Sequence, residues 1–103
     1  MIDEQTIFSV TIHDDASAML YAHVRFVANV SITAARKLRT TLYKAIASLE
    51  KMPQRCPVYQ TRRAAGTYRR LIIGRYQIIF SINEANRIVS IRYILDSRQE
   101  NDI

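Results

Sequence analysis

Three apolar segments follow one another in the last third of the chain, and they restrict the possible folds more than any other feature. They span residues 68–73, 75–82 and 87–95, and the short breaks between them contain Gly74 and residues 83–86. In the middle segment, large apolar side chains occur at every second position. This period is typical of a strand with one buried face, and short turns join neighbouring strands in antiparallel fashion. The sequence therefore predicts a three-stranded antiparallel meander.

The alternation also predicts which side chains share a face of this sheet. In the last segment, Val89, Ile91, Tyr93 and Leu95 fall on one face, which we expect to pack against helices. The opposite face is expected to carry polar side chains, namely Arg75, Gln77, Ser81, Ser90 and Arg92. Because an antiparallel sheet can leave one face in water, we expect this face to form an open basic surface.

The first part of the chain predicts a strand followed by a helix. Residues 7–12 alternate between apolar and polar side chains, as a short strand does. Asp14 or Asp15 is a suitable N-cap for the helix that follows, and residues 29–31 interrupt the helical pattern.

A second amphipathic helix follows this break, with Ser31 or Thr33 as its N-cap. Its apolar stripe has three- and four-residue spacings and consists of Ala35, Leu38, Leu42, Ile46, Leu49 and Met52. Pro53 is expected to end it, because proline cannot continue a helix. Two helices with so short a connection predict an antiparallel helical hairpin.

The element order is therefore β-α-α-β-β-β. This order predicts an α+β fold in which the helical hairpin packs on one face of an antiparallel sheet. The 103 residues are close to the common size of one domain, so a single domain over residues 1–103 is expected. Residues 53–67 form the only long predicted loop, and long loops in compact domains are often functional.

Positive charge is concentrated in the second half of the chain. The formal net charge is +6, yet residues 1–24 contain acidic side chains and no lysine or arginine. Between Arg55 and Arg75 there is no acidic residue, and the arginines are Arg55, Arg62, Arg63, Arg69, Arg70 and Arg75. A solvated surface would account for such charge, but its segregation favours an anionic partner, either nucleic acid or an acidic protein. Arginine suits bidentate contact with phosphate or carboxylate.

Most catalytic templates have no match in the sequence. With one cysteine, two histidines and two glycines, the chain offers neither a zinc pattern nor a glycine-rich phosphate loop, so no cofactor or metal is expected. His23 lies on the apolar stripe of the first helix, where packing is the commoner role and general acid–base chemistry the alternative. Asp96 and Glu100 could flank one site, although capping is the more frequent use of such residues.

The tyrosines and the single cysteine leave further alternatives. Tyr68, Tyr76 and Tyr93 lie in predicted strands, where half-buried packing is the usual role and stacking on bases the other. Cys56 cannot form an intramolecular disulfide, which suits a reducing compartment. The N-terminal residues lack a signal-peptide pattern and no apolar run has membrane-spanning length, so we expect a cytoplasmic protein without a membrane partner.

The strands carry a resemblance to a known family. The segment Tyr68-Arg69-Arg70-Leu71-Ile72-Ile73-Gly74-Arg75-Tyr76-Gln77-Ile78-Ile79-Phe80, followed by Ile91-Arg92-Tyr93-Ile94-Leu95-Asp96-Ser97-Arg98, resembles the C-terminal half of the RelE/ParE superfamily. These proteins are the toxins of bacterial type II toxin–antitoxin modules, which serve in plasmid stabilisation. The stretch from Pro53 to Pro57 is similar to what precedes the sheet in many members. The family's element order is also the one predicted above.

The resemblance implies two alternative activities. RelE-like members cut mRNA on the ribosome, and ParE-like members poison DNA gyrase without cutting RNA. Where the nuclease pattern has basic residues, Arg69 and Arg98 match, whereas Gln77 and Leu71 stand at two further basic positions. No tyrosine or histidine follows Arg98. Since missing cations should weaken a site that stabilises phosphate charge, the resemblance favours the ParE-like branch, and hence a protein that is not an enzyme.

The resemblance also implies partners. A cognate antitoxin whose segment orders on binding is expected, giving a hetero-oligomer, with DNA gyrase as the target and the ribosome with mRNA as the alternative target. The residues expected to bind the target or the antitoxin are Arg62, Arg63, Arg69, Arg70, Arg75, Arg92 and Arg98, and the candidates for a nuclease site are Arg69, Arg98 and Gln77. A non-toxic nucleic-acid- or protein-binding module is a third possibility.

Overall fold

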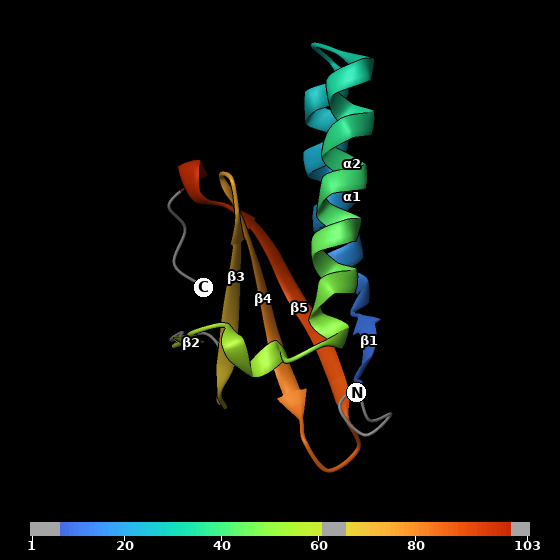
Figure 1. Ribbon diagram of the computed structural model, residues 1–103. Coiled ribbons are helices and arrows are strands. Elements are labelled where there is room, and N and C mark those ends of the chain that lie inside the picture. Colours follow the sequence, from blue (N-terminus) through green and yellow to red (C-terminus); the bar gives the residue numbers. More distant parts are fainter. Residues whose placement is uncertain (1–6, 61–65, 100–103) are drawn as a thin grey trace.

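A five-stranded sheet and a long helical hairpin make up the fold (Figure 1). The computed structural model describes residues 7–60 and 66–99. The strands are β1 (Ser9–Ile12), β2 (Val58–Tyr59), β3 (Tyr68–Ile73), β4 (Tyr76–Asn83) and β5 (Ile88–Asp96). The helices are α1 (Asp14–Ala28) and α2 (Ile32–Ala47), and the 3₁₀ turns are η2 (Ser48–Glu50), η3 (Pro53–Arg55) and η4 (Ser97–Gln99). Neither α1 nor α2 combines the length and the apolar character that crossing a membrane requires.

The strands lie in the order β1-β5-β4-β3-β2. The meander β3-β4-β5 is antiparallel as predicted, and the α+β fold class is confirmed. Two features were not predicted: β2 forms within the expected loop and pairs with β3, and β1 pairs in parallel with β5, so the sheet is mixed. The β1–β5 pairing joins segments that are far apart in the sequence. The pattern of apolar residues in each segment predicts a strand, but not the strand with which it pairs.

The helix starts follow from local chemistry. The side chain of Ser31 accepts a hydrogen bond from the main-chain N–H of Ala34 at 3.1 Å, so Ser31 is the N-cap of α2. For α1 the predicted cap was wrong: His13 holds the N-cap position without a side-chain bond, and Asp14 and Asp15 lie in the first turn. There they stabilise the helix through its dipole.

The main core lies between the hairpin and one face of the sheet. Its fully buried side chains include Leu42 from α2, Phe80 from β4 and Ile91 from β5, while Leu20 contributes from α1. The hairpin extends beyond the end of the sheet (Figure 1). Since no sheet lies beneath its tip, Val30, Ile32 and other apolar side chains remain exposed there.

A β-bulge in β5 changes the predicted faces of that strand. Ile79 of β4 is opposite Tyr93, whereas the next residue, Phe80, is opposite Ile91, so Arg92 is an extra residue. As predicted, Ile91 faces the helices. Tyr93 and Leu95 do not: they pack with Ile79 on the opposite face, because the extra residue reverses the alternation beyond it. The predicted common face for Val89, Ile91, Tyr93 and Leu95 was therefore wrong in its second half.

The face away from the helices is consequently not simply polar. Tyr68 and Ile79 are buried there, with Tyr59, Tyr93 and Leu95 packed around them. The register places Gln77, Ser81 and Ser90 on this face, as predicted. This surface is called the open face below. It combines a small aromatic cluster with polar side chains.

Candidate interaction sites

The arginines predicted to form a binding surface lie in three separate places. Arg62 and Arg63 fall outside the described residues. Arg70 and Arg92 lie on the open face, Arg75 and Arg98 lie near the end of the sheet where β3 turns into β4, and Arg69 faces the helix side. The five described arginines therefore do not converge on a single pocket.

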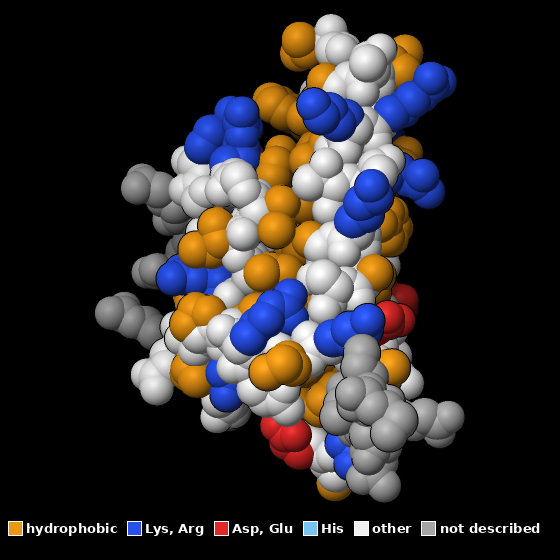
Figure 2. Space-filling model, viewed as in Figure 1, with side chains coloured by type: hydrophobic (Ala, Val, Ile, Leu, Met, Phe, Trp, Pro, Cys, Tyr) orange, Lys and Arg blue, Asp and Glu red, His pale blue; other side chains and the backbone are white. Residues whose placement is uncertain are grey.

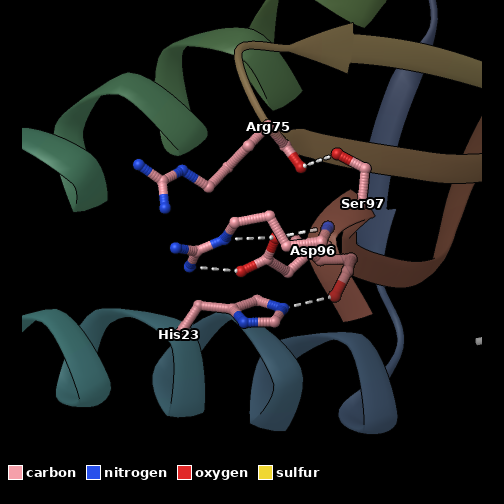
Figure 3. A network of polar contacts seen from close by, with 6 residues as sticks. His23, Arg75, Asp96 and Ser97 are labelled. Carbon is pink, nitrogen blue, oxygen red and sulfur yellow. Dashed lines mark hydrogen bonds and ion pairs between the residues drawn. The ribbon is translucent and has the colours of Figure 1, made fainter. Parts of the chain in front are cut away.

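The end of the sheet holds a polar cluster built around Asp96, the last residue of β5 (Figure 3). Its buried carboxylate accepts three bonds from Arg98: Oδ2 from Nη2 at 2.8 Å, and Oδ1 from the main-chain N–H at 2.9 Å and from Nε at 3.3 Å. The Arg98 side chain is 55% exposed. Asp96 thus both caps the turn that follows β5 and fixes the Arg98 guanidinium at the surface.

Two further contacts fix this cluster in place. Ser97 donates hydrogen bonds to the carbonyl oxygen of Arg75 from its main-chain N–H at 2.7 Å and from its hydroxyl at 2.5 Å. His23 of α1 donates from Nε2 to the carbonyl oxygen of Ile94 at 2.7 Å, since a carbonyl can only accept. Its ring centroid lies 5.2 Å from that of Tyr76. His23 therefore has a structural role. β1 ends before it reaches Ile94, so the carbonyl of Ile94 has no partner in β1 and is satisfied by His23 instead.

The charges in the cluster shift the ionisation of both members of the ion pair. The hydrogen bonds from the Arg98 side chain lower the pKa of Asp96, and they outweigh the burial of the carboxyl group, which raises it. The same hydrogen bond to Asp96 raises the pKa of Arg98. Near neutral pH, the Asp96 side chain is therefore ionised and negatively charged, and the Arg98 side chain is positively charged.

Arg75 is the cation in this cluster that remains available to a ligand. It follows Gly74, whose φ of 58° suits the first central position of a two-residue hairpin turn. Its carbonyl is engaged by Ser97, but its guanidinium has no hydrogen bond among the described residues and points away from Ser97 in Figure 3. A free guanidinium next to an ion-paired one suits a carboxylate or phosphate from a partner.

The open face combines arginine with tyrosine. The guanidinium carbon of Arg70 lies 5.2 Å from the ring centroid of Tyr59, and that of Arg92 lies 6.0 Å from the ring centroid of Tyr68. Arg70 also donates to Gln77 Oε1 at 3.3 Å. These contacts hold two cations beside aromatic rings, which spreads positive charge over this face.

Arg69 has a structural role on the helix side of the sheet. Its Nη1 donates to the carbonyl oxygens of Cys56 at 2.6 Å and Gln54 at 3.1 Å. It thereby ties the chain after α2 to β3. Burial raises the pKa of the Cys56 thiol, although the charges of Arg55 and Arg69 partly oppose this, so Cys56 is an unreactive thiol.

Replacing Arg69 by alanine should destabilise the fold. Two main-chain carbonyls lose a charged donor, which corresponds to about 1–2 kcal/mol of unfolding free energy for partly exposed bonds. Urea unfolding measures the change, and limited proteolysis should show faster cleavage near residues 53–57. Arg75→Ala is the matched control, because the Arg75 side chain forms no hydrogen bond or ion pair with another residue in 7–60 or 66–99. Equal effects of the two substitutions would contradict the assignment.

The three nuclease candidates do not meet. Arg69 is opposite Phe80 and faces the helices, Gln77 lies on the open face, and Arg98 is beyond the end of β5. The described residues also contain no cluster of three or more histidine, cysteine, aspartate or glutamate side chains that could hold a metal ion.

Comparisons with known proteins agree with the fold. A family model described as the ParE toxin of the type II toxin–antitoxin system parDE matches residues 10–101. The chain therefore belongs to this toxin family, within the RelE/ParE superfamily. Among solved structures, the toxin–antitoxin complex RelBE2 from Mycobacterium tuberculosis contains a similar chain, with a TM-score of 0.63, 19% identity, and coverage of 92% of this chain and 97% of that one. A search of curated proteins gave no significant match.

Some members of these sites were not predicted. Tyr59 lay in an expected loop, and its pairing with β3 has no local signal beyond the β-branched Val58 beside it. The contact between His23 and Ile94 depends on how α1 crosses β5 and has no sequence signal. The opposite directions of Arg69 and Arg70, in contrast, follow directly from strand alternation.

Proposed function

We propose that this toxin arrests growth by poisoning DNA gyrase. The observation that carries the proposal is the placement of Arg69. A nuclease of this superfamily would need that cation to stabilise phosphate charge, but its guanidinium is bonded to two main-chain carbonyls. Gln77, which stands where the nuclease pattern has an arginine, lies on the other face of the sheet and accepts a bond from Arg70.

Binding to gyrase requires a surface rather than a reactive centre. The cluster at the end of the sheet offers one, because the Arg75 guanidinium has no hydrogen bond with another described residue and Arg98 is held by Asp96. The arginine–tyrosine contacts of the open face offer a second, with the aromatic and arginine content that is common at energetically important interface positions. We assign target binding to Arg75, Arg92 and Arg98 on this basis.

We further propose a cognate antitoxin that binds and neutralises the toxin as a hetero-oligomer. The similar chain of known structure is part of a toxin–antitoxin complex. An antitoxin segment with acidic side chains would complement the net charge of +6. Its carboxylates could reach Arg70 and Arg75, since neither forms an ion pair within the described part of the chain.

A supercoiling assay tests the gyrase proposal. Relaxed plasmid, ATP and gyrase are incubated with the purified toxin, and we expect supercoiling to be inhibited. Arg75→Gln should raise the concentration needed for half-inhibition by about tenfold, which corresponds to 1.4 kcal/mol of binding. Lys51→Gln is the matched control, since it removes an exposed cation outside both surfaces.

The same preparation separates the alternatives. Normal supercoiling with excess toxin, together with cleavage of mRNA in the ribosomal A site of a translating extract, would establish the nuclease activity instead. Normal supercoiling, intact mRNA and unaffected growth on expression would indicate a non-toxic binding module.

A further inference from the structure

The charged side chains of the helical hairpin beyond the first two residues of α1 are all positive. From residue 16 to residue 49 the sequence contains no aspartate or glutamate, and its cations are Arg25, Arg36, Lys37, Arg39 and Lys44. All five side chains are exposed, and none forms an ion pair with another described residue. Figure 2 shows lysine and arginine side chains along the upper half of α2 with no acidic side chain among them. Nothing in the fold requires this, because the core of α2 is on its other side.

Three of the four cations of α2 lie on its outward face. The buried residues of α2 include Ala35, Leu42 and Ile46, which define the inward stripe. Residues three, four, seven or eight positions apart on a helix lie on one side, so Arg36, Thr40 and Lys44 lie together, away from this stripe, and Lys37 lies beside Thr40 and Lys44. Arg39 is four residues after Ala35 and three before Leu42, so it lies next to the inward stripe, but its side chain is exposed and contacts the Tyr43 ring. This surface, formed by Arg36, Lys37, Arg39, Thr40, Tyr43, Lys44 and Ala47, is called the α2 face below.

The charges of the α2 face are dense along the helix. Residues 36–44 cover about 12 Å of helix at 1.5 Å per residue, and this length carries four cations. Duplex DNA carries one negative charge per about 1.7 Å of axis, so the same length of duplex holds about seven phosphates on its two strands. The α2 face can therefore contact several phosphates at once.

The remaining side chains of the α2 face also suit a phosphate backbone. Arg39, Thr40, Tyr43, Lys44 and Ala47 line a shallow concavity of about 470 Å³. The hydroxyls of Thr40 and Tyr43 are donors of the type that contacts phosphate oxygens. The Arg39 guanidinium carbon lies 5.3 Å from the ring centroid of Tyr43, which holds that cation beside the concavity.

We propose that the α2 face binds the phosphate backbone of duplex DNA without reading its sequence. A protein partner is less well matched, because lysine and unpaired charge are depleted at the centre of protein interfaces, and two of the four cations of the α2 face are lysines. The exposed aliphatic side chains of the hairpin, Val30 and Ile32, are instead at its tip. The choice of DNA over RNA rests on the proposed gyrase target, since gyrase acts on duplex DNA.

Fluorescence anisotropy with a labelled 20-base-pair DNA duplex tests this without gyrase. The purified toxin is titrated at several salt concentrations. The variant Arg36→Gln, Lys37→Gln, Lys44→Gln should bind more than tenfold more weakly, and the slope of log affinity against log salt should be shallower by about 2.7, the value for three lost phosphate contacts. The control variant Lys51→Gln, Ala85→Glu, Asn86→Asp has the same net charge, with all changes at exposed positions away from α2. It should keep the wild-type slope.

Each other outcome overturns the proposal. Equal losses in both variants would mean that only net charge matters. Failure of the wild type to bind the duplex, with the α2 variant losing affinity for an antitoxin, would assign the face to a protein partner. Tighter binding to an RNA duplex of the same sequence would replace DNA as the ligand. Because gyrase is absent from this assay, its result is independent of the supercoiling test.

Discussion

Deleting Ile79 should unfold the protein, whereas deleting Arg92, which lies next to the partner of Ile79 in β5, should leave it folded. Without Ile79, β4 must slip by one position on one side of the gap. Either Phe80 or Ile78, both fully buried, then turns to the open face, and a polar neighbour, Ser81 or Gln77, takes its place in the core. Losing a phenylalanine from a core costs about 3–5 kcal/mol, a large part of the 5–15 kcal/mol that typically holds a domain together.

Arg92 is different because it is the extra residue of the bulge. Without it, Ile91 and Tyr93 become neighbours, and the register with β4 continues unchanged as a regular strand. Every later side chain keeps its face. The expected loss is about 1 kcal/mol, comparable to the contact of Arg92 with the Tyr68 ring.

Circular dichroism and urea unfolding of the two deletion variants measure this contrast. Arg92→Ala serves as the control for loss of the side chain without loss of the residue, and it should match the Arg92 deletion. If deleting Arg92 unfolds the chain as deleting Ile79 does, the bulge is essential to the sheet and the register argument is wrong.

Asp96→Asn should produce the second large effect, a loss of stability that depends on pH. At neutral pH the variant lacks the negative charge of the Asp96 carboxylate. The two hydrogen bonds that the Arg98 side chain donates to this group are then weakened. Hydrogen bonds to charged groups contribute about 1.5–3 kcal/mol. Because the Arg98 side chain is 55% exposed and solvent screens the pair, we expect a smaller loss of about 1–2 kcal/mol.

The direction of the pH dependence follows from the lowered pKa of Asp96. In the unfolded chain this group titrates near its ordinary value of 3.8, and in the folded chain it titrates lower. Its contribution to stability is therefore fully present above about pH 4 and is lost as the pH falls through the folded pKa. Wild type and variant should differ at pH 7 and converge in acid.

Thermal unfolding between pH 7 and pH 2 measures the convergence. Asp14→Asn is the matched control, because Asp14 is an exposed carboxylate in the first turn of α1 and should contribute at most about 1 kcal/mol. A constant difference between wild type and Asp96→Asn at every pH would show that the carboxylate charge does not stabilise the fold.

Local patterns were sufficient to predict the two helices and the order of β1, β3, β4 and β5, but not β2 and not the register of β5 in the sheet. The helix cap at Ser31 and the turn at Gly74 depend on a few neighbouring residues, and both are visible in the sequence. The bulge is not, because Val89, Ile91, Tyr93 and Leu95 form an unbroken alternation. The change of face after Ile91 arises from the pairing of β5 with β4, and the sequence of β5 alone does not indicate it.

For the candidate sites, the sequence predicted the types of residue involved, but only partly the face of the sheet toward which each side chain points. The sequence predicts a single binding surface for the arginines, whereas the structure places the described ones in three separate regions. Alternation alone would have separated Arg69 from Arg70. The role of Asp96 could have been suggested by its position two residues before Arg98, a common spacing for a side chain that caps a turn. The contact of His23 required the packing of α1 on β5, which is a tertiary feature.

The position of β5 has a consequence for how the molecule is made. β5 follows the other four described strands in the chain, yet it lies between β1 and β4 and packs against α1. Until β5 leaves the ribosome, β1 lacks the strand with which it pairs and the hairpin lacks much of the surface it covers. Because contacts between distant parts of a chain form slowly, we expect the hairpin to assemble early and the sheet to close only after β5 has emerged. The toxin would then acquire its binding surfaces in one late step.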